Sequence, residues 1–481
     1  MFVRYLILAF TVFPLFIQSF AQPEVPELAL KINEVLTDTF FNRCNIAIDI
    51  YDLTDQKYLF QKNENLLLTP ASNQKILTTA AAARFLGTYF KFETKLFHTG
   101  IIDNGVLYGD LYIVGGFDPM FKYSDLDTLL KPLNELGINK ITGKVFGDVS
   151  FKDSLYWGKG WMWDDNPDPT AVYLSSLNIN ENSVKVFVEG KVIDSSAVVN
   201  LDVPDGYFKI INNSITIKNR KDNDEFEVTR DWLNNPKNIL VNGFVPIGKQ
   251  FDEEESTEKL NVQNPEDYFL FLVTQKLDER GIQCEGKYEL AKLPENSVYL
   301  NSVYRPIDSV IVFTNKESDN LGAEMLLYAL ALNDSAELAT RKNGLEEVNR
   351  FIDSLGFNSE NFSVADGSGV SRYNLLSAEL ILGCLKYLYY RNPGIFNLIY
   401  SSFPVGGIDG TLEKRFIDTK VFNNIHAKTG TLSGVSTLSG YITSANQHML
   451  AFSIMLENYV EKSKYARKFI DRICELLAEY K

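Results

Sequence analysis

The sequence has few of the residues that usually carry metal-dependent or histidine-dependent catalysis. Its three histidines and four cysteines are widely separated along 481 residues. They are His98, His426, His448, Cys44, Cys284, Cys384 and Cys474. No Cys-x-x-Cys pair occurs, so a cysteine metal site is not expected, and disulfides and buried free thiols stay equally open. Each histidine is isolated, which makes a serine-histidine-aspartate triad a poor candidate.

Basic residues are also in deficit. There are 47 lysines and arginines against 62 aspartates and glutamates, giving a formal net charge of −15. Nucleic acid is therefore excluded as a partner, because phosphate binding needs a basic surface. Hydrophobic residues make up 45% of the chain and aromatic residues 13%, which is ample for packed cores in two to four domains of roughly 100–200 residues each.

Long apolar runs are missing beyond the N-terminus, so no later segment is expected to span a bilayer. The N-terminus itself carries Arg4, an apolar run from Tyr5 to Ile17, and Ser19-Phe20-Ala21 as a small-x-small cleavage site. These features predict a secretory signal peptide over residues 1–21 and a mature chain that begins at Gln22. A membrane anchor is the alternative, but the run is short and Pro14 interrupts it.

The predicted secondary structure of the rest of the chain changes twice. Residues 45–63, "NIAIDIYDLTDQKYLFQKN", alternate around a turn and predict two antiparallel strands. Residues 93–262 are β-rich and divided by Gly, Asn and Asp, which predicts an insert with a nested third unit at about 182–250. Helical spacing dominates from residue 263, followed by three strand candidates and a last helix from Glu461 to Tyr480. We therefore expect an α/β (α+β) catalytic unit, residues 22–92 and 263–481, whose antiparallel sheet is flanked by helices.

The stretch "TPASNQKILTTAAAARFLG", from Thr69 to Gly87, predicts a helix that opens near Ser72. Lys75 stands three residues later, on the same helix face, and can reach the Ser72 hydroxyl. Serine is a weak nucleophile unless a base takes its proton. Lysine can be that base only when desolvation or a nearby cation keeps it partly neutral. Taken alone, the pair does not indicate catalysis, because SxxK often occurs by chance and a capping serine and a solvated lysine explain it.

Two further motifs change this interpretation. Ser318-Asp319-Asn320 precedes a predicted helix, and Lys428-Thr429-Gly430 lies in a predicted strand. The order SxxK, SDN, KTG is the signature of penicillin-binding proteins and class A β-lactamases. Each motif is weak by itself, and Ser318 and Asn320 also suit a cap and a turn. Together and in order they predict one acyl-transfer site.

The expected roles follow from the chemistry of the side chains. Lys428 is a second ammonium that disfavours charge on a nearby Lys75, and it can bind a substrate carboxylate with help from the Thr429 hydroxyl. Gly430 lets a substrate backbone lie against the strand edge.

The remaining motif residues have complementary expected roles. The backbone N–H groups of Ser72 and Thr431 are candidates for an oxyanion hole. Ser318 can relay a proton to the leaving amine, and Asn320 can orient Lys75 and the substrate amide.

With these motifs, the sequence resembles the D-alanyl-D-alanine carboxypeptidase/endopeptidase family of low-molecular-mass penicillin-binding proteins, the type-4 group. Ser318 lies 246 positions after Ser72, which fits the insert of this family, whereas β-lactamases have a much shorter gap. Further similar stretches cover the mature chain. They are "GGFDP" (115–119), "GWMWDD" (160–165), "SSLNINENSV" (175–184), "DGSGVSRYN" (366–374) and "GGIDGTLEKRF" (406–416).

The resemblance implies a penicilloyl-serine transferase fold with inserted domains and a periplasmic or cell-wall-facing hydrolase. It implies peptidoglycan stem peptides and β-lactams as partners, no cofactor, and leaves open a loose membrane association and a homodimer. It also implies that Asp164 or Asp165 selects substrate and that Arg372 is a second substrate contact. We further expect the tryptophans beside the aspartates to exclude water from that contact. The alternative interpretation of "GWMWDD" is a packed aromatic turn without a binding role.

Other functions remain alternatives from the sequence. A β-lactamase should carry a deacylating glutamate between the second and third motifs, where Glu346-Glu347 reads instead as the polar face of a helix. A penicillin-sensing module that is acylated without turnover and a cell-wall scaffold with a degenerate site are the others, and the intact motifs disfavour the scaffold.

Overall fold

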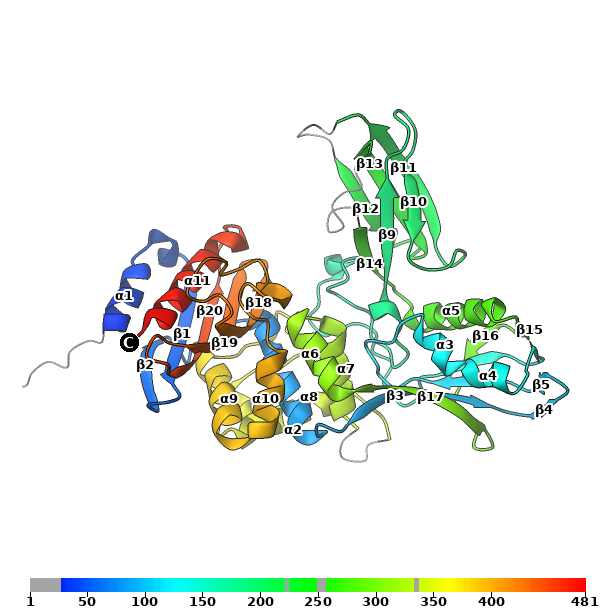
Figure 1. Ribbon diagram of the computed structural model, residues 1–481, viewed down its shortest axis with the longest axis horizontal. Coiled ribbons are helices and arrows are strands. Elements are labelled where there is room, and N and C mark those ends of the chain that lie inside the picture. Colours follow the sequence, from blue (N-terminus) through cyan, green and yellow to red (C-terminus); the bar gives the residue numbers. More distant parts are fainter. Residues whose placement is uncertain (1–26, 220, 222–224, 249–256, 333–336) are drawn as a thin grey trace, which may run out of the picture.

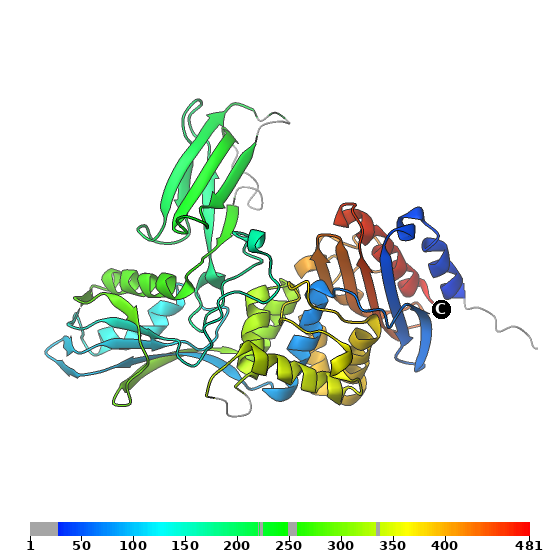
Figure 2. The same cartoon turned by 180° about the vertical axis from the view of Figure 1, so that it is seen from behind.

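The chain forms three lobes, shown from opposite sides in Figures 1 and 2. The computed structural model describes residues 27–219, 221, 225–248, 257–332 and 337–481. The predicted signal peptide lies outside these residues. Within them, no helix has the length and apolarity needed to cross a membrane.

A five-stranded antiparallel sheet forms the centre of the first lobe. Across the sheet its strands are β18 (Ile425–Leu432), β19 (Val435–Thr443), β20 (Met449–Glu457), β1 (Asn45–Asp52) and β2 (Lys57–Lys62). Two helices share one hydrophobic cluster with this sheet: α1 (Glu27–Val35) and α11 (Ser463–Glu479). The predicted antiparallel sheet flanked by helices is confirmed, and strands from both ends of the chain complete it.

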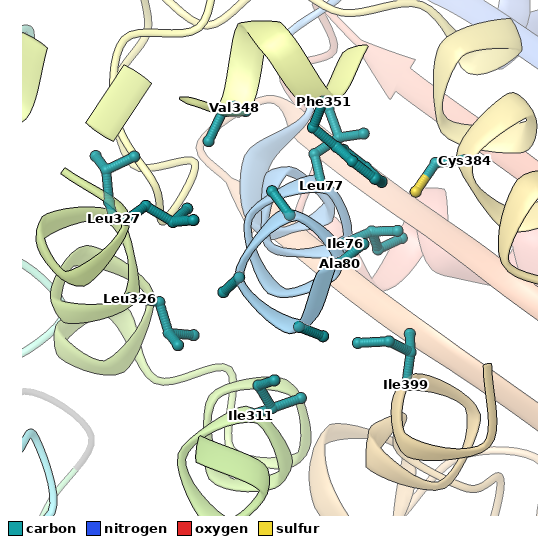
Figure 3. Packing of buried hydrophobic residues seen from close by; sticks show 14 of the residues in the cluster. Ile76, Leu77, Ala80, Ile311, Leu326, Leu327, Val348, Phe351, Cys384 and Ile399 are labelled. Atoms are coloured by element: carbon teal, nitrogen blue, oxygen red, sulfur yellow. The ribbon is translucent and has the colours of Figure 1, made fainter. Parts of the chain in front are cut away.

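Helix α2 (Gln74–Phe85) lies at the centre of the helices on the other side of the sheet (Figure 3). The helices around it are α6 (Ile307–Lys316), α7 (Asn320–Leu330), α8 (Arg341–Ser354), α9 (Ala378–Arg391) and α10 (Pro393–Ser402). Every residue of α2 from Gln74 to Ala83 is buried. The small side chains of Ala80–Ala83 allow neighbouring helices to approach closely, so this helix is held rigidly on all sides.

The second lobe contains a five-stranded and a four-stranded sheet. The first sheet has the order β16 (Tyr288–Leu290), β8 (Val145–Asp148), β6 (Leu111–Val114), β3 (Lys91–His98) and β17 (Val298–Pro306). The second has the order β15 (Gln283–Cys284), β7 (Lys140–Ile141), β5 (Val106–Tyr108) and β4 (Ile101–Asp103). The helices of this lobe are α3 (Asp125–Leu129), α4 (Lys131–Glu135) and α5 (Pro265–Glu279).

The second lobe extends further along the chain than the sequence indicated. We expected the catalytic unit to resume at residue 263, but α5 buries Tyr268 and Phe269 in the core of the second lobe. Strand β17 pairs antiparallel with β3, the strand that opens this lobe. The chain therefore re-enters the catalytic lobe only at α6, because an apolar helix face fits either core and only strand pairing decides between them.

The described residues between Ser183 and Asn261 form the third lobe, in the region where the nested unit was expected. One of its sheets has the order β10 (Val198–Leu201), β9 (Ser183–Glu189) and β14 (Thr257–Asn261). The other has the order β11 (Lys209–Ile217), β13 (Asn238–Pro246) and β12 (Phe226–Arg230). This lobe projects away from the other two (Figure 1).

The central position of α2 generates a stability prediction. Leu77 is fully buried in the cluster of Figure 3. We expect Leu77→Ala to cost about 2–5 kcal/mol, because a cavity remains where the side chain was. Calorimetry should show a lower thermal midpoint, while Leu30→Ala, at a position that is 56% exposed on α1, should leave it nearly unchanged. Equal midpoints for both variants would contradict the packing described here.

Candidate active site

Ser72 lies on a short 3₁₀ turn, Ala71–Asn73, that leads directly into α2. The helix itself begins at Gln74, two residues beyond the predicted opening near Ser72. The Thr437 hydroxyl donates to the carbonyl oxygen of Pro70 at 3.0 Å, and the Asn73 side-chain amide donates to the Ser439 hydroxyl at 2.6 Å. Both contacts fix the turn to β19, so Ser72 is held at the end of a buried helix.

The backbone of this turn is strained. Ala71 has a φ of 46°, a left-handed conformation that is unfavourable for a residue with a side chain. Gly369 lies directly beneath it, with a φ of 88°, and a Cβ there would come within 1.9 Å of the Ala71 carbonyl oxygen. The surrounding structure thus imposes the conformation that presents Ser72, a pattern common at functional sites.

Lys75 is completely buried and its Nζ has three acceptors. It donates to Ser72 Oγ at 3.0 Å, Asn320 Oδ1 at 2.6 Å and the Ser368 carbonyl at 2.7 Å. Burial lowers the pKa of Lys75 to about 8, against the opposing charges of Asp319, Asp366 and Glu324. A substantial share of the amine is therefore neutral near pH 8 and able to accept the proton of Ser72.

Glu324 fixes the loop whose Ser368 carbonyl accepts a hydrogen bond from Lys75. It is buried on α7, and its Oε1 accepts the backbone N–H groups of Gly367 at 3.0 Å and Ser368 at 2.8 Å. Burial raises the pKa of Glu324 to about 8. Its carboxyl group orients the Ser368 carbonyl toward Lys75. The sequence analysis did not assign this residue, although a glutamate within the apolar run "LGAEMLLYAL" was a visible signal.

The second motif enters the site from the start of α7. Asp319 caps this helix by accepting from Gly322 N–H, so Ser318 does not serve as the cap. Ser318 has a φ of 59°, and its hydroxyl accepts a hydrogen bond from Lys428 Nζ at 2.8 Å. Asn320 also donates to the Thr170 carbonyl of the insert at 2.6 Å. The second motif thus connects both lysines with the insert.

The third motif lies on β18, as predicted. Lys428 is buried, and its Nζ also donates to the Thr429 carbonyl at 3.1 Å. Burial, reinforced by the charge of Lys75, holds the pKa of Lys428 well below its usual range. The charge of Lys75 thus disfavours charge on Lys428, whereas the lowered pKa of Lys75 has its own burial as the cause, so the predicted effect of Lys428 on Lys75 stays a prediction.

Gly430 has a role that the sequence analysis did not anticipate. A Cβ there would lie 3.0 Å from both Ser72 N and the Pro70 carbonyl, and 2.2 Å from Thr437 Oγ1. Glycine is needed for the Ser72 turn to lie against β18, in addition to any contact with substrate.

The three motifs meet at one cleft of about 480 Å³. Its lining is rich in hydroxyl groups and includes two arginines from outside the motifs. The residues are Ser72, Thr170, Glu317, Ser318, Asn320, Thr411, Arg415, Thr429, Gly430, Thr431, Ser436, Thr437, Arg467 and Ile470. The arrangement offers a serine with an adjacent base and is suited to acyl transfer.

The softer predictions fall outside this lining. Asp165 accepts the Met162 N–H at 2.8 Å, and burial raises the pKa of its carboxyl. Asp164 is exposed. Arg372 donates to the Ser433 carbonyl at 2.9 Å, and its charge acts on Asp165. Arg372 is close enough to influence the pKa of Asp165, but none of the three residues is among those that line the cleft.

The tryptophans of "GWMWDD" differ from one another. Trp161 is buried and donates to Asp366 at 2.8 Å, which ties the insert to the loop beside Lys75. Trp163 is 68% exposed and lies against Trp232 of the third lobe, with ring centroids 5.3 Å apart. The expectation that both rings exclude water is wrong for Trp163, which is largely exposed and faces the third lobe, and it stays a prediction for Trp161.

Glu346 and Glu347, considered as deacylating residues of a β-lactamase, lie on α8. Glu346 pairs with Lys342 and Glu347 pairs with Arg350 on the same helix. They form its polar face, as expected, and neither is among the residues that line the cleft.

One histidine lies close to acidic side chains. His448 Nδ1 is 2.8 Å from Asp52 Oδ2, and Asp55 is nearby. Asp52 also accepts the N–H groups of Thr54 and Asp55, and Asp55 pairs with Lys57. Because these oxygens have protein partners, we assign no metal to the cluster. All four cysteines of the chain are free thiols.

Comparison with known proteins gives one family. Residues 28–480 match the sequence model of the "D-Ala-D-Ala carboxypeptidase 3 (S13) family". The D-alanyl-D-alanine carboxypeptidase DacB of Haemophilus influenzae is 28% identical over 468 residues, covering 92% of this chain and 89% of the relative. A D-alanyl-D-alanine carboxypeptidase of Actinomadura sp. (strain R39) is 27% identical over 473 residues, covering 94% and 85%.

A solved structure agrees with these relatives. The crystal structure of penicillin binding protein 4 (dacB) from Haemophilus influenzae has a TM-score of 0.80 and 26% identity, covering 93% of this chain and 99% of its own. The same protein complexed with a novel β-lactam has a TM-score of 0.73 and 25% identity, covering 94% and 100%. The predicted fold, with its inserted lobes, is therefore confirmed.

The buried position of Lys75 generates a direct prediction. Heteronuclear NMR on protein with labelled lysine should show one amine titrating near pH 8, well below the ~10.4 of lysine in water. The signal should disappear in Lys75→Arg, which supplies its assignment. A Lys75 midpoint above pH 10 would mean that the amine stays charged and cannot serve as the base.

Proposed function

The chain belongs to the D-Ala-D-Ala carboxypeptidase 3 (S13) family, and we propose that it cleaves peptidoglycan stem peptides through an acyl-enzyme on Ser72. The observation that carries this proposal is the contact of Lys75 with both Ser72 and Asn320. It joins two motifs 245 residues apart, and Lys428 joins the third through Ser318. The same chemistry serves a carboxypeptidase and an endopeptidase, which differ only in the amine that leaves.

Acylation begins at the hydroxyl of Ser72. Neutral Lys75 accepts the hydroxyl proton while it keeps donating to Asn320 and the Ser368 carbonyl, so the base stays in place when its charge changes. The Ser72 oxygen then attacks the carbonyl of the scissile D-Ala bond. The backbone N–H groups of Ser72 and Thr431 stabilise the negative oxygen that develops.

Breakdown of the tetrahedral intermediate needs a proton on the leaving nitrogen. Ser318 can donate its hydroxyl proton to that nitrogen and recover one from Lys428, its 2.8 Å partner. The departing D-amino acid leaves an ester on Ser72. Before the second half-reaction, Lys75 releases to solvent the proton that it took from Ser72, and Lys428 regains one. Neutral Lys75 then takes a proton from a water molecule as the water oxygen attacks the ester carbonyl, and it gives that proton to the Ser72 oxygen when the ester bond breaks.

A β-lactam would follow the first half of this reaction, because its strained amide presents the same carbonyl to Ser72. The Haemophilus relative whose structure holds a β-lactam supports this part of the proposal. We also propose that the enzyme is exported and acts in the periplasm or at the cell wall. The support is the signal-like residues 1–21 together with the family to which the chain belongs.

The role of Ser72 is tested by covalent labelling. Ser72→Ala should abolish labelling by a fluorescent penicillin and hydrolysis of a D-Ala-D-Ala peptide, because no nucleophile remains. Ser401→Ala, an exposed serine on α10, serves as the control and should label like the unchanged protein. Persistent labelling of the Ser72→Ala variant would show that another residue is the nucleophile.

Asp164 provides a second test, concerned with substrate choice. We propose that its exposed carboxylate meets the free ammonium of a diamino-acid stem at the mouth of the cleft. Such a partly desolvated ion pair should give roughly 5- to 150-fold selectivity, which Asp164→Asn should remove. kcat/KM should fall for a free-amine stem and stay nearly constant for an N-acetylated stem and for simple penicillins.

Asp165→Asn is the matched comparison, because this carboxylate already accepts the Met162 N–H and should act mainly through the shape of the turn. We expect its losses to be similar on both stems. If Asp164→Asn also lowers both rates equally, Asp164 is structural. If neither variant changes either rate, the segment does not contribute to substrate choice.

A further inference from the structure

The base of the third lobe contains a buried arginine whose hydrogen-bond acceptors, among the described residues, are all neutral. Arg230 ends β12 and is 1% exposed. Its guanidinium group donates to Asn261 Oδ1, to Asn166 Oδ1 at 3.3 Å, to Gln263 Oε1 at 3.2 Å and to the Pro236 carbonyl at 3.4 Å. Burying a charged group without an opposite charge is costly, so the arginine and these oxygens hold one another in place.

Asn261 connects this arginine with the insert segment beside the cleft. It is the last residue of β14 and is fully buried. Its Oδ1 accepts from Arg230, and its Nδ2 donates to Asn166 Oδ1 at 3.0 Å, to the Asp168 carbonyl at 3.2 Å and to the Ala171 carbonyl at 2.7 Å. The guanidinium group therefore fixes which end of the Asn261 amide faces the segment, and that amide holds the backbone of residues 166–171.

The same segment orients the side chain that contacts the catalytic base. Thr170 lies within it, and its carbonyl accepts from Asn320 Nδ2 at 2.6 Å. Asn320 Oδ1 in turn accepts from Lys75 Nζ at 2.6 Å. The two ends of an asparagine amide have nearly the same shape, so the partner of one end decides what the other end presents. The Thr170 carbonyl thus directs the oxygen of Asn320, and not its amino group, toward Lys75.

We propose that Arg230 is a positioning residue for acyl transfer, through which the third lobe sets the orientation of Asn320 toward Lys75. This inference rests on the proposed function, because Lys75 is the base of that reaction. The connection runs through Asn261 and the backbone around Thr170. The third lobe projects away from the other two (Figure 1), and none of the residues that line the cleft belongs to it. It therefore acts on the chemistry without touching substrate.

Loss of this connection should change the titration of Lys75 in one direction. An oxygen that accepts from an ammonium group stabilises the charged form, so its removal lowers the pKa of the amine. A substitution of Arg230 leaves the charged groups that face Lys75 unchanged. These groups are Asp319, Glu324, Asp366 and Lys428. The midpoint should therefore fall below pH 8, and acylation should slow because the base is no longer held in place.

Arg230→Met tests the proposal, because methionine fills much of the space and removes every donor. With a chromogenic β-lactam, the plateau rate of acyl-enzyme formation should fall about 5- to 50-fold, and its pH midpoint should fall by about half a unit or more. Arg230→Lys keeps one charged donor and should recover part of both changes. An unchanged plateau and midpoint in Arg230→Met would overturn the proposal.

Lys237→Met is the matched control at the base of the same lobe. Lys237 pairs with Asp267 of α5 at 2.7 Å, so this variant weakens the attachment of the third lobe without removing a partner of residues 166–171. The plateau and the midpoint should match those of the unsubstituted protein. Equal changes in Lys237→Met and Arg230→Met would come from general loosening of the lobe and would overturn the connection.

Asp168→Ala tests the same connection from the surface, should Arg230→Met not fold. Asp168 is exposed, and its carboxylate accepts the Thr170 N–H at 2.7 Å. Its removal loosens Thr170, so the midpoint should fall in the same direction by a smaller amount. With Arg230→Met unfolded, an unchanged midpoint in Asp168→Ala would overturn the proposal.

A double-mutant cycle separates positioning from a structural role. In an Asn320→Ala background the connection has no end point, so adding Arg230→Met should lower the acylation rate by no more than about 2-fold. Losses that multiply would mean that Arg230 acts by another route. The midpoint of Lys75 is also measured by NMR on labelled lysine without substrate. A midpoint lowered by Arg230→Met in a protein that cleaves no stem peptide would support the connection and overturn the proposed function.

Discussion

The structure of the active site depends on the burial of one amine. Lys75 sits on a helix that is buried along most of its length, and its Nζ is surrounded by Ser72, Asn320 and the Ser368 carbonyl. Burial lowers the pKa of this amine to about 8, while nearby carboxylates prevent the pKa from falling further. The helix core, the strained turn at Ala71 and the loop held by Glu324 all serve this environment.

The insert is part of the same arrangement. Asn320 reaches the Thr170 carbonyl, and Trp161 reaches Asp366, so a segment far from the motifs in sequence supports the second motif and the loop beside Lys75. Both hydrogen bonds connect the insert with residues that position the catalytic groups. They imply that catalytic geometry and the docking of the insert depend on each other, because side chains in one hydrogen-bonded network are energetically coupled.

The sequence predicted the parts that local patterns encode. Strand alternation located the sheet, and the three motifs identified Ser72, Lys75, Ser318, Asn320, Lys428 and Thr429, which the structure brings together. The sequence patterns did not predict which strands pair over long distances in the chain. Whether α5 packs on the catalytic lobe or the insert is decided by β17 pairing with β3, and no local signal marks that choice. Glu324 and Arg467 were missed because each looks like an ordinary helix residue until the tertiary contacts of α7 and α11 are known.

The central claim is that neutral Lys75 activates Ser72. The most direct measurement is the rate of acyl-enzyme formation, followed by rapid-mixing kinetics with a chromogenic β-lactam from pH 5.5 to 9.5. Because the unprotonated amine is the reactive form, the rate of acyl-enzyme formation should rise about tenfold per pH unit at acidic pH. It should level off near pH 8. A rate that is constant across this range would contradict the account, because the activating group would then not titrate where buried Lys75 does.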